Sequence, residues 1–245
     1  MGNPLQLHLE AFAKLSRDDR ALIAHATRTV KTIEARRDII REGDKPVGVN
    51  VVLEGWAYRY KQLPDGRRQI VSFFIPGDLC DTNVFILKEM DHSIGSITRV
   101  SYSQILAPEF EELMARSPRI TAALWWHELV TAAIQREWTT NVGQRTAAER
   151  LGHLFCEMFI RLRVVGLVDG NSCDWPLTQY DLADSTGLTA VHVNRTLQEL
   201  RRLQLIELHG KRLTIPDLAR LMEASMFNAN YLHLDGEGRH MDAND

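Results

Sequence analysis

The sequence has few cysteines, no long apolar run and no large excess of either charge. Its three cysteines, Cys80, Cys156 and Cys173, are an odd number and lie far apart, so they do not form a disulfide framework. No apolar stretch reaches the roughly 18 residues that a membrane-spanning helix needs. The N-terminus also lacks the basic start and the apolar stretch of a secretory signal. These absences predict a soluble cytoplasmic protein.

Motifs that carry catalysis or hold a metal are missing as well. No Ser-His-Asp arrangement, phosphate-cradling glycine loop or paired carboxylate motif occurs, so the sequence does not indicate an enzyme. The spacing of the acidic, cysteine and histidine residues between Asp78 and His92 fits no metal-ligand template, and no metal or other cofactor is predicted. Cys156 is expected in a core. Cys173 is expected as an exposed thiol whose pKa the neighbouring Asp174 raises.

The formal net charge of −3 argues against nucleic-acid binding through bulk charge. Residues 1–142 and residues 143–225 are each neutral, so the whole acidic excess lies in the last twenty residues. Residues 189–213, however, carry an excess of basic side chains: Arg195, Arg201, Arg202, Lys211 and Arg212, against Glu199 and Glu207. A local basic patch of this kind, rather than the overall charge, is what contacts phosphates.

The 245 residues suffice for two modest domains, and the hydrophobic pattern changes along them. Residues 5–30 have helical spacing, whereas residues 36–103 form short runs separated by turn sequences. Trp56, Tyr58 and Tyr60 alternate with polar or small residues, and Asp65-Gly66 predicts a hairpin because glycine supplies the positive φ of its turn. Many short strands predict a small barrel or sandwich, which encloses one small ligand or packs only its own side chains.

A long helix is predicted over residues 118–142, with a stripe of residues spaced alternately by four and three. The stripe consists of Ile120, Leu124, His127, Thr131, Ile134 and Trp138. We interpret it as the seam of a two-stranded coiled coil that joins two subunits of a homodimer, with Trp125 and Trp126 packing on the barrel. The alternative is that the stripe itself packs on the protein's own barrel.

The last third of the chain predicts a helix over 144–164, followed by a helix-turn-helix over 178–203. Thr178 and Thr189 are N-cap residues, and Gly187 stands where a left-handed C-terminal residue belongs. Residues 205–215 predict two short strands around His209-Gly210, a wing with basic residues beside its turn. The alternative is a plain helical hairpin with a β-ribbon.

The second helix, residues 189–203, is predicted to enter a major groove of DNA. Val193, Leu197 and Leu200 face the core, which leaves a polar face near the helix N-terminus. The candidate DNA-binding residues are Thr189, Ala190, Val191, His192, Asn194, Arg195, Gln198, Lys211 and Arg212. The competing hypothesis is an effector-sensing module whose helix-turn-helix serves as a protein-interaction surface. That surface would need more exposed apolar area than this polar face offers.

Three pieces of sequence together resemble the Crp/Fnr transcription regulators: Gly77-Asp78-Leu79, the stretch 182–195 and the hairpin 205–215. The resemblance covers about residues 10–222. It implies an α+β fold with a cyclic-nucleotide-binding-like β-roll (10–117), a dimerisation helix (118–142) and a winged helix-turn-helix domain (143–222). Residues 223–245 are expected to form a flexible tail. The implied partners are double-stranded DNA, a second copy of the chain, RNA polymerase and an effector bound in the roll.

The departures from the family pattern concern the effector. Members that respond to cyclic AMP follow Gly-Asp-Leu with a Gly-Glu pair and later an Arg-Ser pair, whereas this chain has Asp81-Thr82 and then no arginine before Arg99. A buried phosphate without such partners is costly, so control by cyclic AMP is not expected. The iron–sulfur members carry several N-terminal cysteines, which are absent here, and the scattered histidines do not indicate haem.

The resemblance also assigns roles within the second helix. It implies that Thr189 and His192 contact phosphates, while Ala190, Val191, Asn194 and Arg195 reach base edges. Many family members carry glutamate at the position of Val191, and that glutamate accepts a hydrogen bond from cytosine. Valine can only touch a thymine methyl group.

Overall fold

A computed structural model describes residues 2–82 and 84–244 of the chain. The chain folds into two compact units. Unit 1 comprises Met1–Lys61, Ser72–Ala132 and Leu232–Asp245, and unit 2 comprises Gln62–Val71 and Ala133–Tyr231. No helix among the described residues is long and apolar enough to cross a membrane.

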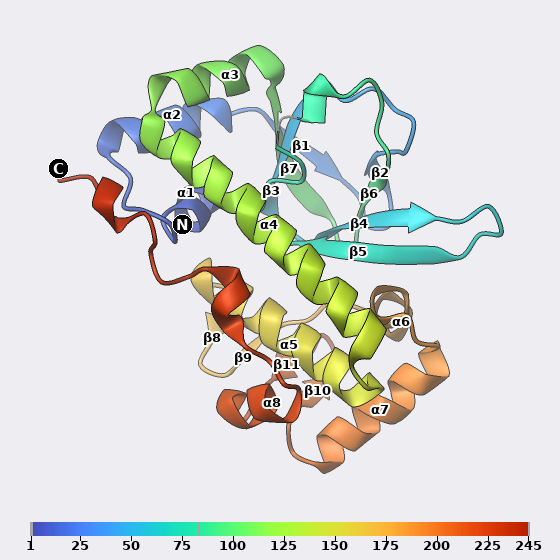
Figure 1. The fold of residues 1–245 in the computed structure, drawn as a ribbon. Helices are drawn as coiled ribbons and strands as arrows, with labels where there is room; N and C mark the ends of the chain where they lie inside the picture. The colour runs from blue at the N-terminus through green and yellow to red at the C-terminus, as the bar shows by residue number, and fades with distance from the viewer. Residues whose placement is uncertain (1, 83, 245) are drawn as a thin grey trace. The chain divides into compact units, whose positions relative to one another are not determined.

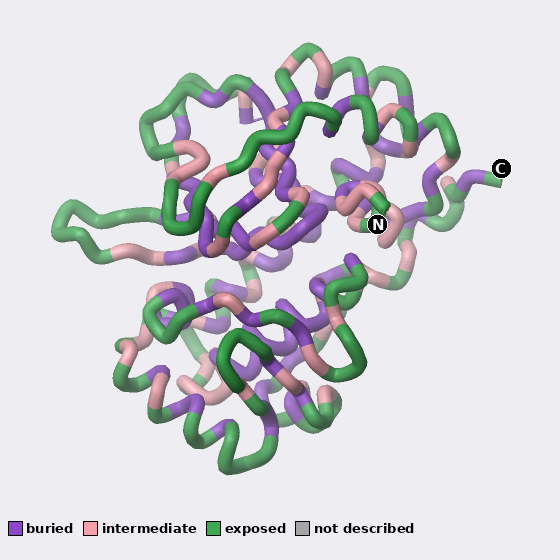
Figure 2. Tube along the Cα trace, turned by 180° about the vertical axis from the view of Figure 1, so that it is seen from behind, coloured by how far each residue is buried: buried purple, intermediate pink, exposed green. Residues whose placement is uncertain are grey.

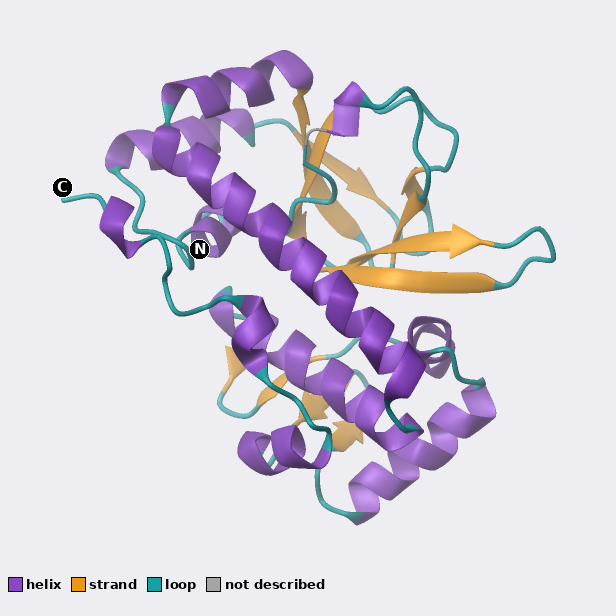
Figure 3. Ribbon diagram, viewed as in Figure 1, coloured by secondary structure: helices purple, strands orange, loops and turns teal. Residues whose placement is uncertain are grey.

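The strands of the first half form two antiparallel sheets, as Figure 3 shows in orange. One sheet has the order β1-β7-β3, with bounds Val30–Ile33, Val100–Leu106 and Gly48–Glu54. The other has the order β2-β6-β4-β5, with bounds Asp38–Ile40, Ser93–Ser96, Ala57–Gln62 and Arg68–Phe74. The end of β4 and the loop to β5, residues 61–67, are exposed throughout (Figure 2), and Gly66 has a φ of 88° in the predicted turn. The fold predicted for this region, a β-roll, is confirmed.

The inner faces of these sheets are filled by the protein's own side chains. A buried cluster joins Val52, Ala57, Phe74, Cys80, Val84, Met90, Ile94 and Val100. The first five residues of β3 are all buried, and so are Ala57, Tyr58 and Tyr60 of β4, so both faces of these strands are covered over much of their length. The sequence leaves open whether the barrel encloses a small ligand or packs only its own side chains. This part of the roll is packed with side chains.

Four helices accompany the sheets in unit 1 (Figure 1): α1 (Pro4–Leu9), α2 (Arg17–Ala26), α3 (Ala107–Arg116) and the first part of α4 (Pro118–Gln144). The helical spacing predicted over residues 5–30 is therefore two helices separated by a break. The break arises because Ser16 caps α2: its hydroxyl accepts from the Asp19 N–H, and the Asp19 carboxylate accepts from the Ser16 N–H. A short 3-10 helix, η1 (Val84–Ile86), lies within the roll.

Helix α5 (Ala147–Val164) forms the core of unit 2 and is buried along most of its length. Around it lie α6 (Gln179–Thr186), α7 (Ala190–Arg202) and α8 (Leu218–Ala224). A small sheet of order β10-β11-β9-β8 completes the unit, with bounds Glu207–His209, Arg212–Thr214, Ser172–Asp174 and Val168–Asp169. The predicted helix-turn-helix and wing are confirmed.

Two expectations about individual segments differ from the structure. Cys173 is not an exposed thiol: it lies in β9, is 2% exposed, and burial followed by the Asp174 charge raises its pKa to about 12. The sequence could place it beside Asp174 but could not show that β9 pairs with β11, which covers it. Cys156 is fully buried, as expected for a core residue.

The segment after α8 lies within residues 223–245, for which a flexible tail is expected, yet the structure gives it defined contacts. It contains two short turns of 3-10 helix, Ala229–Leu232 and Arg239–Met241, and its Leu232 is only 1% exposed. Its few apolar residues find partners far away in the sequence, and its backbone makes hydrogen bonds to the segment around Phe12 and Lys14. Composition is a local property and does not reveal such partners.

A buried histidine on α5 yields a pH-dependent prediction. The ring of His153 is 1% exposed, packs on Phe227 and Tyr231, and lies 3.3 Å from a Glu137 oxygen. Burial, together with the charge of Arg145, lowers its pKa from 6.5 to about 4, although Glu137 acts in the opposite direction. Between these two values the unfolded chain binds a proton that the folded chain does not, so acidification through this window favours unfolding.

We therefore predict that the free energy of unfolding falls by about 1–3 kcal/mol between pH 7 and pH 4.5 because of this one residue. The measurement is urea denaturation at both pH values. His153→Gln should lose that part of the pH dependence, whereas His25→Gln, which alters an exposed histidine on α2, should keep it. Equal pH dependence in His153→Gln and the natural protein would contradict the assignment.

Candidate nucleic-acid interface

The helix-turn-helix begins with a closed capping box at α6. The Thr178 hydroxyl accepts from the Asp181 N–H at 3.2 Å, and an Asp181 oxygen accepts from the Thr178 N–H at 2.9 Å. Helix α6 ends at Gly187, which has a φ of 67°, a backbone conformation that costs other residues free energy. The capping residues and the glycine that the sequence predicts thus set both ends of this helix.

Helix α7 begins at the N-cap Thr189, whose hydroxyl accepts from the His192 N–H at 3.2 Å. Its inner face is formed by Val193, Leu197 and Leu200, each no more than 3% exposed, as predicted. Thr196 joins this face and donates to the His192 carbonyl. The inner face packs on α5, and this packing positions the opposite face toward solvent.

The predicted DNA-binding residues of α7 lie together on that outer face. Thr189, Val191, His192, Arg195 and Gln198 are exposed, and Ala190 and Asn194 are half-buried. Val191 is 71% exposed, and the Gln198 amide donates to the Asn194 oxygen at 3.1 Å. The N-terminus of α7 also carries the positive end of the helix dipole. The face therefore combines hydrogen-bonding groups, one guanidinium and a favourable field for phosphate.

The wing places basic side chains beside a tight turn. β10 and β11 pair in antiparallel register, and Gly210 has a φ of 59° at the turn between them. Lys211 is exposed. Arg212 lies 3.4 Å from Asp169 and 3.8 Å from Asp174, and all three side chains are about half or more exposed. Water screens such pairs strongly, so the region around Arg212 stays positive. The two nearby carboxylates make its positive potential weaker than the basic sequence of the wing suggests.

Two residues that the sequence analysis does not single out belong to this region. Arg150 of α5 donates to the Thr186 carbonyl at 2.9 Å and to the Arg145 carbonyl at 2.8 Å, so it ties the helix-turn-helix turn to the linker before α5. Tyr180 is 73% exposed near the start of α6. The sequence carries no signal for Arg150, because its partners are backbone atoms. An aromatic residue on the polar side of a short helix is a signal that could have identified Tyr180.

The predicted coiled-coil seam of α4 is occupied by the chain itself. Ile120, Leu124, His127, Ile134 and Trp138 are between 0% and 7% exposed, and Thr131 is half-buried. His127 lies 2.9 Å from the His8 ring, and Trp138 donates to Glu157. The prediction that these residues join two subunits is therefore wrong. The alternative is packing on the protein's own barrel, but the contacts of His127 are to α1 and those of Trp138 are to α5.

A second stripe of α4 is exposed instead. Trp125 is 64% and Leu129 is 66% exposed, while Ala122 and Ala132 continue the same three-and-four spacing. Trp125 and Trp126 are expected to pack on the barrel, but Trp126 is buried against Phe12 of the N-terminal segment and Trp125 is exposed. Both stripes have the spacing of a coiled coil, so spacing alone could not decide which one is free.

The roll contains a half-buried arginine, Arg59, that no sequence motif indicates. Arg59 of β4 lies 2.6 Å from Asp81, donates to the Cys80 carbonyl, and stacks over the Phe74 ring at 5.1 Å. The His92 ring bridges to the second Asp81 oxygen at 3.1 Å. The positive charge within this part of the roll is thus already matched by an internal carboxylate.

The comparisons with known proteins agree with this architecture. Residues 30–117 match a family model described as a cyclic nucleotide-binding domain, and residues 149–224 match a Crp-like helix-turn-helix domain. Among solved structures, the chain is similar to FixK2 from Bradyrhizobium japonicum, with a TM-score of 0.71 and 23% identity. The similarity covers 80% of this chain and 96% of that one.

Curated relatives show similarity at the level of sequence. The chain is 30% identical over 197 residues to the transcriptional activator protein FnrL of Cereibacter sphaeroides, covering 79% of each chain. It is also 30% identical over 186 residues to the nitrogen fixation regulation protein FixK of Bradyrhizobium diazoefficiens, covering 75% of this chain and 76% of the relative.

Proposed function

Because the chain belongs to the Crp/Fnr family of transcription regulators, we propose that it acts as a homodimer that reads a palindromic DNA site with α7. The family assignment makes the chain a DNA-binding regulator rather than an enzyme. The outer face of α7 is the observation that supports the mode of reading. It is exposed, polar and close to the helix N-terminus, which is the part of a recognition helix that contacts base edges.

Within this face, Arg195 is the main specificity residue of the proposal. A guanidinium can donate two hydrogen bonds to guanine O6 and N7, and the exposed Arg195 side chain is available for this contact. Val191 can only touch a thymine methyl group, so the base pair beside that guanine should show no strict preference for cytosine. Ala190 and Asn194 complete the base-reading set, and Thr189 and His192 contact phosphates. Gln198 and the wing residues Lys211 and Arg212 flank them.

The two subunits of the proposed dimer pair through the exposed stripe of α4. Trp125 and Leu129 would otherwise leave a large apolar area in water, and Ala122 and Ala132 allow a second helix to approach closely. The same stripe continues along α4 to Arg136, so the helix offers a long, regularly spaced seam. A two-fold dimer presents two recognition helices to half-sites about one helical turn apart.

The effector of the roll is not cyclic AMP in this proposal. A cyclic phosphate needs a free cation or several amide groups when it is buried. Arg59 is committed to Asp81 and to the Cys80 carbonyl, so a phosphate would have to displace an existing carboxylate. A different small molecule, recognised by the roll, remains the proposed input, and RNA polymerase remains the proposed partner at the promoter.

The first prediction concerns base reading. Arg195→Ala should weaken binding to the selected site by about 1–3 kcal/mol and relax the preference at one base pair in each half-site. Lys211→Ala or Arg212→Ala should instead weaken binding to all DNA sequences alike and lower the dependence of affinity on salt. Selection from a random DNA library, followed by gel shifts over a salt series, measures both effects.

Recovery of the same motif by Arg195→Ala and the natural protein would show that another residue reads the guanine. Failure of the natural protein to shift any sequence would favour a protein-interaction surface on α7.

The second prediction concerns the dimer. The double variant Trp125→Glu/Leu129→Glu would place like charges against each other along the seam, so it should be monomeric at micromolar concentration. Light scattering should give the mass of one chain, 27.9 kDa, for this variant and twice that mass for the natural protein. Ile86→Glu, which changes an exposed apolar residue of the roll, is the matched control and should stay dimeric.

If the double variant is still dimeric, the interface lies on a surface other than the exposed stripe of α4.

The third prediction concerns the effector. Titration calorimetry of the natural protein with cyclic AMP should show no binding in the low-micromolar range, because the half-buried guanidinium of Arg59 is already paired with Asp81. A low-micromolar dissociation constant would contradict this part of the proposal and leave the DNA-reading part unaffected.

A further inference from the structure

The chain continues beyond the helix-turn-helix as a segment that neither family match includes, since the second match ends at residue 224. We call residues 225–244 the C-terminal strap. Up to Tyr231 the strap belongs to unit 2, and from Leu232 onward it belongs to unit 1. The strap is therefore a connection between the two units in addition to α4.

The first end of the strap is anchored in the core of unit 2. The Tyr231 hydroxyl donates to a Glu157 oxygen at 2.9 Å, and Glu157 is completely buried on α5. Phe227 is 7% exposed, with its ring 4.8 Å from the ring of His153. A buried carboxylate that loses a hydrogen-bond donor is costly, so this anchor is stronger than a surface contact.

The second end is attached to unit 1 by main-chain hydrogen bonds. The Gly238 N–H donates to the Phe12 carbonyl, and the Ala243 N–H donates to the Lys14 carbonyl, both at 3.1 Å. In return, the Lys14 N–H donates to a carboxylate oxygen of Asp242 at 2.7 Å. These contacts are to the segment between α1 and α2, beside which the C-terminal end lies in Figure 1.

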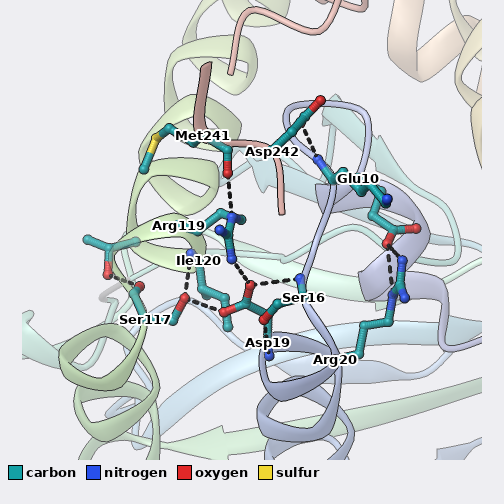
Figure 4. Close-up of polar contacts among 11 residues, drawn as sticks. Glu10, Ser16, Asp19, Arg20, Ser117, Arg119, Ile120, Met241 and Asp242 are labelled. Atoms are coloured by element: carbon teal, nitrogen blue, oxygen red, sulfur yellow. Dashed lines mark hydrogen bonds and ion pairs between the residues drawn. The ribbon is translucent and has the colours of Figure 1, made fainter. Parts of the chain in front are cut away.

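Side chains of α2 and α4 complete this attachment, as Figure 4 shows. Arg119 donates to the Met241 carbonyl at 2.5 Å and also pairs with Asp19. Ser117 donates to the other Asp19 oxygen. Burial would raise the pKa of Asp19, but the hydrogen bonds from Ser117, Ser16 and Arg119 outweigh it and lower that pKa. Arg119 is thus held in place by an ionised carboxylate and presents its Nε–H to the strap.

One residue of the strap has no room for a side chain. A Cβ on Gly238 would lie 2.5 Å from two atoms of the Phe12 ring, much closer than a real Cβ contact. Phe12 is itself 9% exposed and packs against Trp126 of α4. The fit between Gly238 and Phe12 provides a way to release the strap without altering any charged group.

We propose that the surface formed by Phe12, Lys14, Asp19 and Arg119 is a docking site for the chain's own residues 238–243, and that the docked strap restrains unit 2. A restrained unit loses less conformational freedom when both recognition helices of a dimer engage DNA together. The strap therefore raises affinity for a palindromic site and leaves the contact of a single recognition helix unchanged. The consequence for DNA rests on the proposed function, whereas the docking itself does not.

Hydrogen exchange of the full chain tests the docking. In Gly238→Val the amides of Lys14 and Ala243 should exchange roughly tenfold faster or more than in the natural protein, because their partners move away. Asn244→Val, an exposed and uncharged change in the same segment, is the matched control and should leave both amides protected. If Gly238→Val does not fold, Asp242→Ala removes one of the docking acceptors instead. Unchanged exchange in a folded Gly238→Val would overturn the docking.

DNA binding tests the restraint. The selected palindrome and a duplex that carries one half-site are titrated with Gly238→Val and with Asn244→Val. We expect Gly238→Val to bind the palindrome roughly tenfold more weakly and the half-site with unchanged affinity. Equal or tighter binding of the palindrome, in a variant whose strap is released by the exchange measurement, would overturn the restraint. If the natural protein binds no DNA, the proposed function fails, and the exchange experiment still decides the docking.

Discussion

The buried carboxylate of Glu157 is the interaction around which unit 2 is organised. Glu157 is completely buried on α5, and burial raises its pKa, because an ion loses its hydration there. It is satisfied by Trp138 of α4 at 3.0 Å, by the Tyr231 hydroxyl at 2.9 Å and by Arg161 at 3.3 Å. These donors come from three separate parts of the chain. Leaving the buried Glu157 carboxylate without these donors would cost free energy. The carboxylate therefore favours structures in which α4, α5 and the start of the strap stay together.

Helix α5 also positions α7, the proposed recognition helix. One face of α7 packs on α5, and Arg150 of α5 holds the turn that precedes α7 through the Thr186 carbonyl. Neither contact uses the outer face of α7, which is why that face can vary in sequence without changing the fold. Arg195 and Val191 can therefore define a base preference of their own, while Val193 and Leu197 maintain the packing.

At two places a group of the chain itself occupies a contact surface. In the roll, Asp81 pairs with Arg59, so an internal carboxylate neutralises the half-buried cation. At the other place, residues 238–243 cover the surface around Phe12 and Arg119. Each contact is held by several hydrogen bonds rather than by apolar area alone, which makes each specific in geometry.

Local sequence signals determined most of unit 2 and the turn at Gly66 between β4 and β5. Capping residues, a left-handed glycine and helical spacing specify α6 and α7, because the hydrogen bonds involved join residues only three or four apart. The same signals placed the candidate DNA-binding residues on one face. Tertiary structure alone decided which stripe of α4 is buried, since Leu124 and Trp125 lie on stripes of equal spacing and differ only in what the rest of the chain covers. It also decided the burial of Cys173, the pairing of Arg59 and the docking of the strap. In each case the partner is distant in sequence, and no local pattern specifies a distant partner.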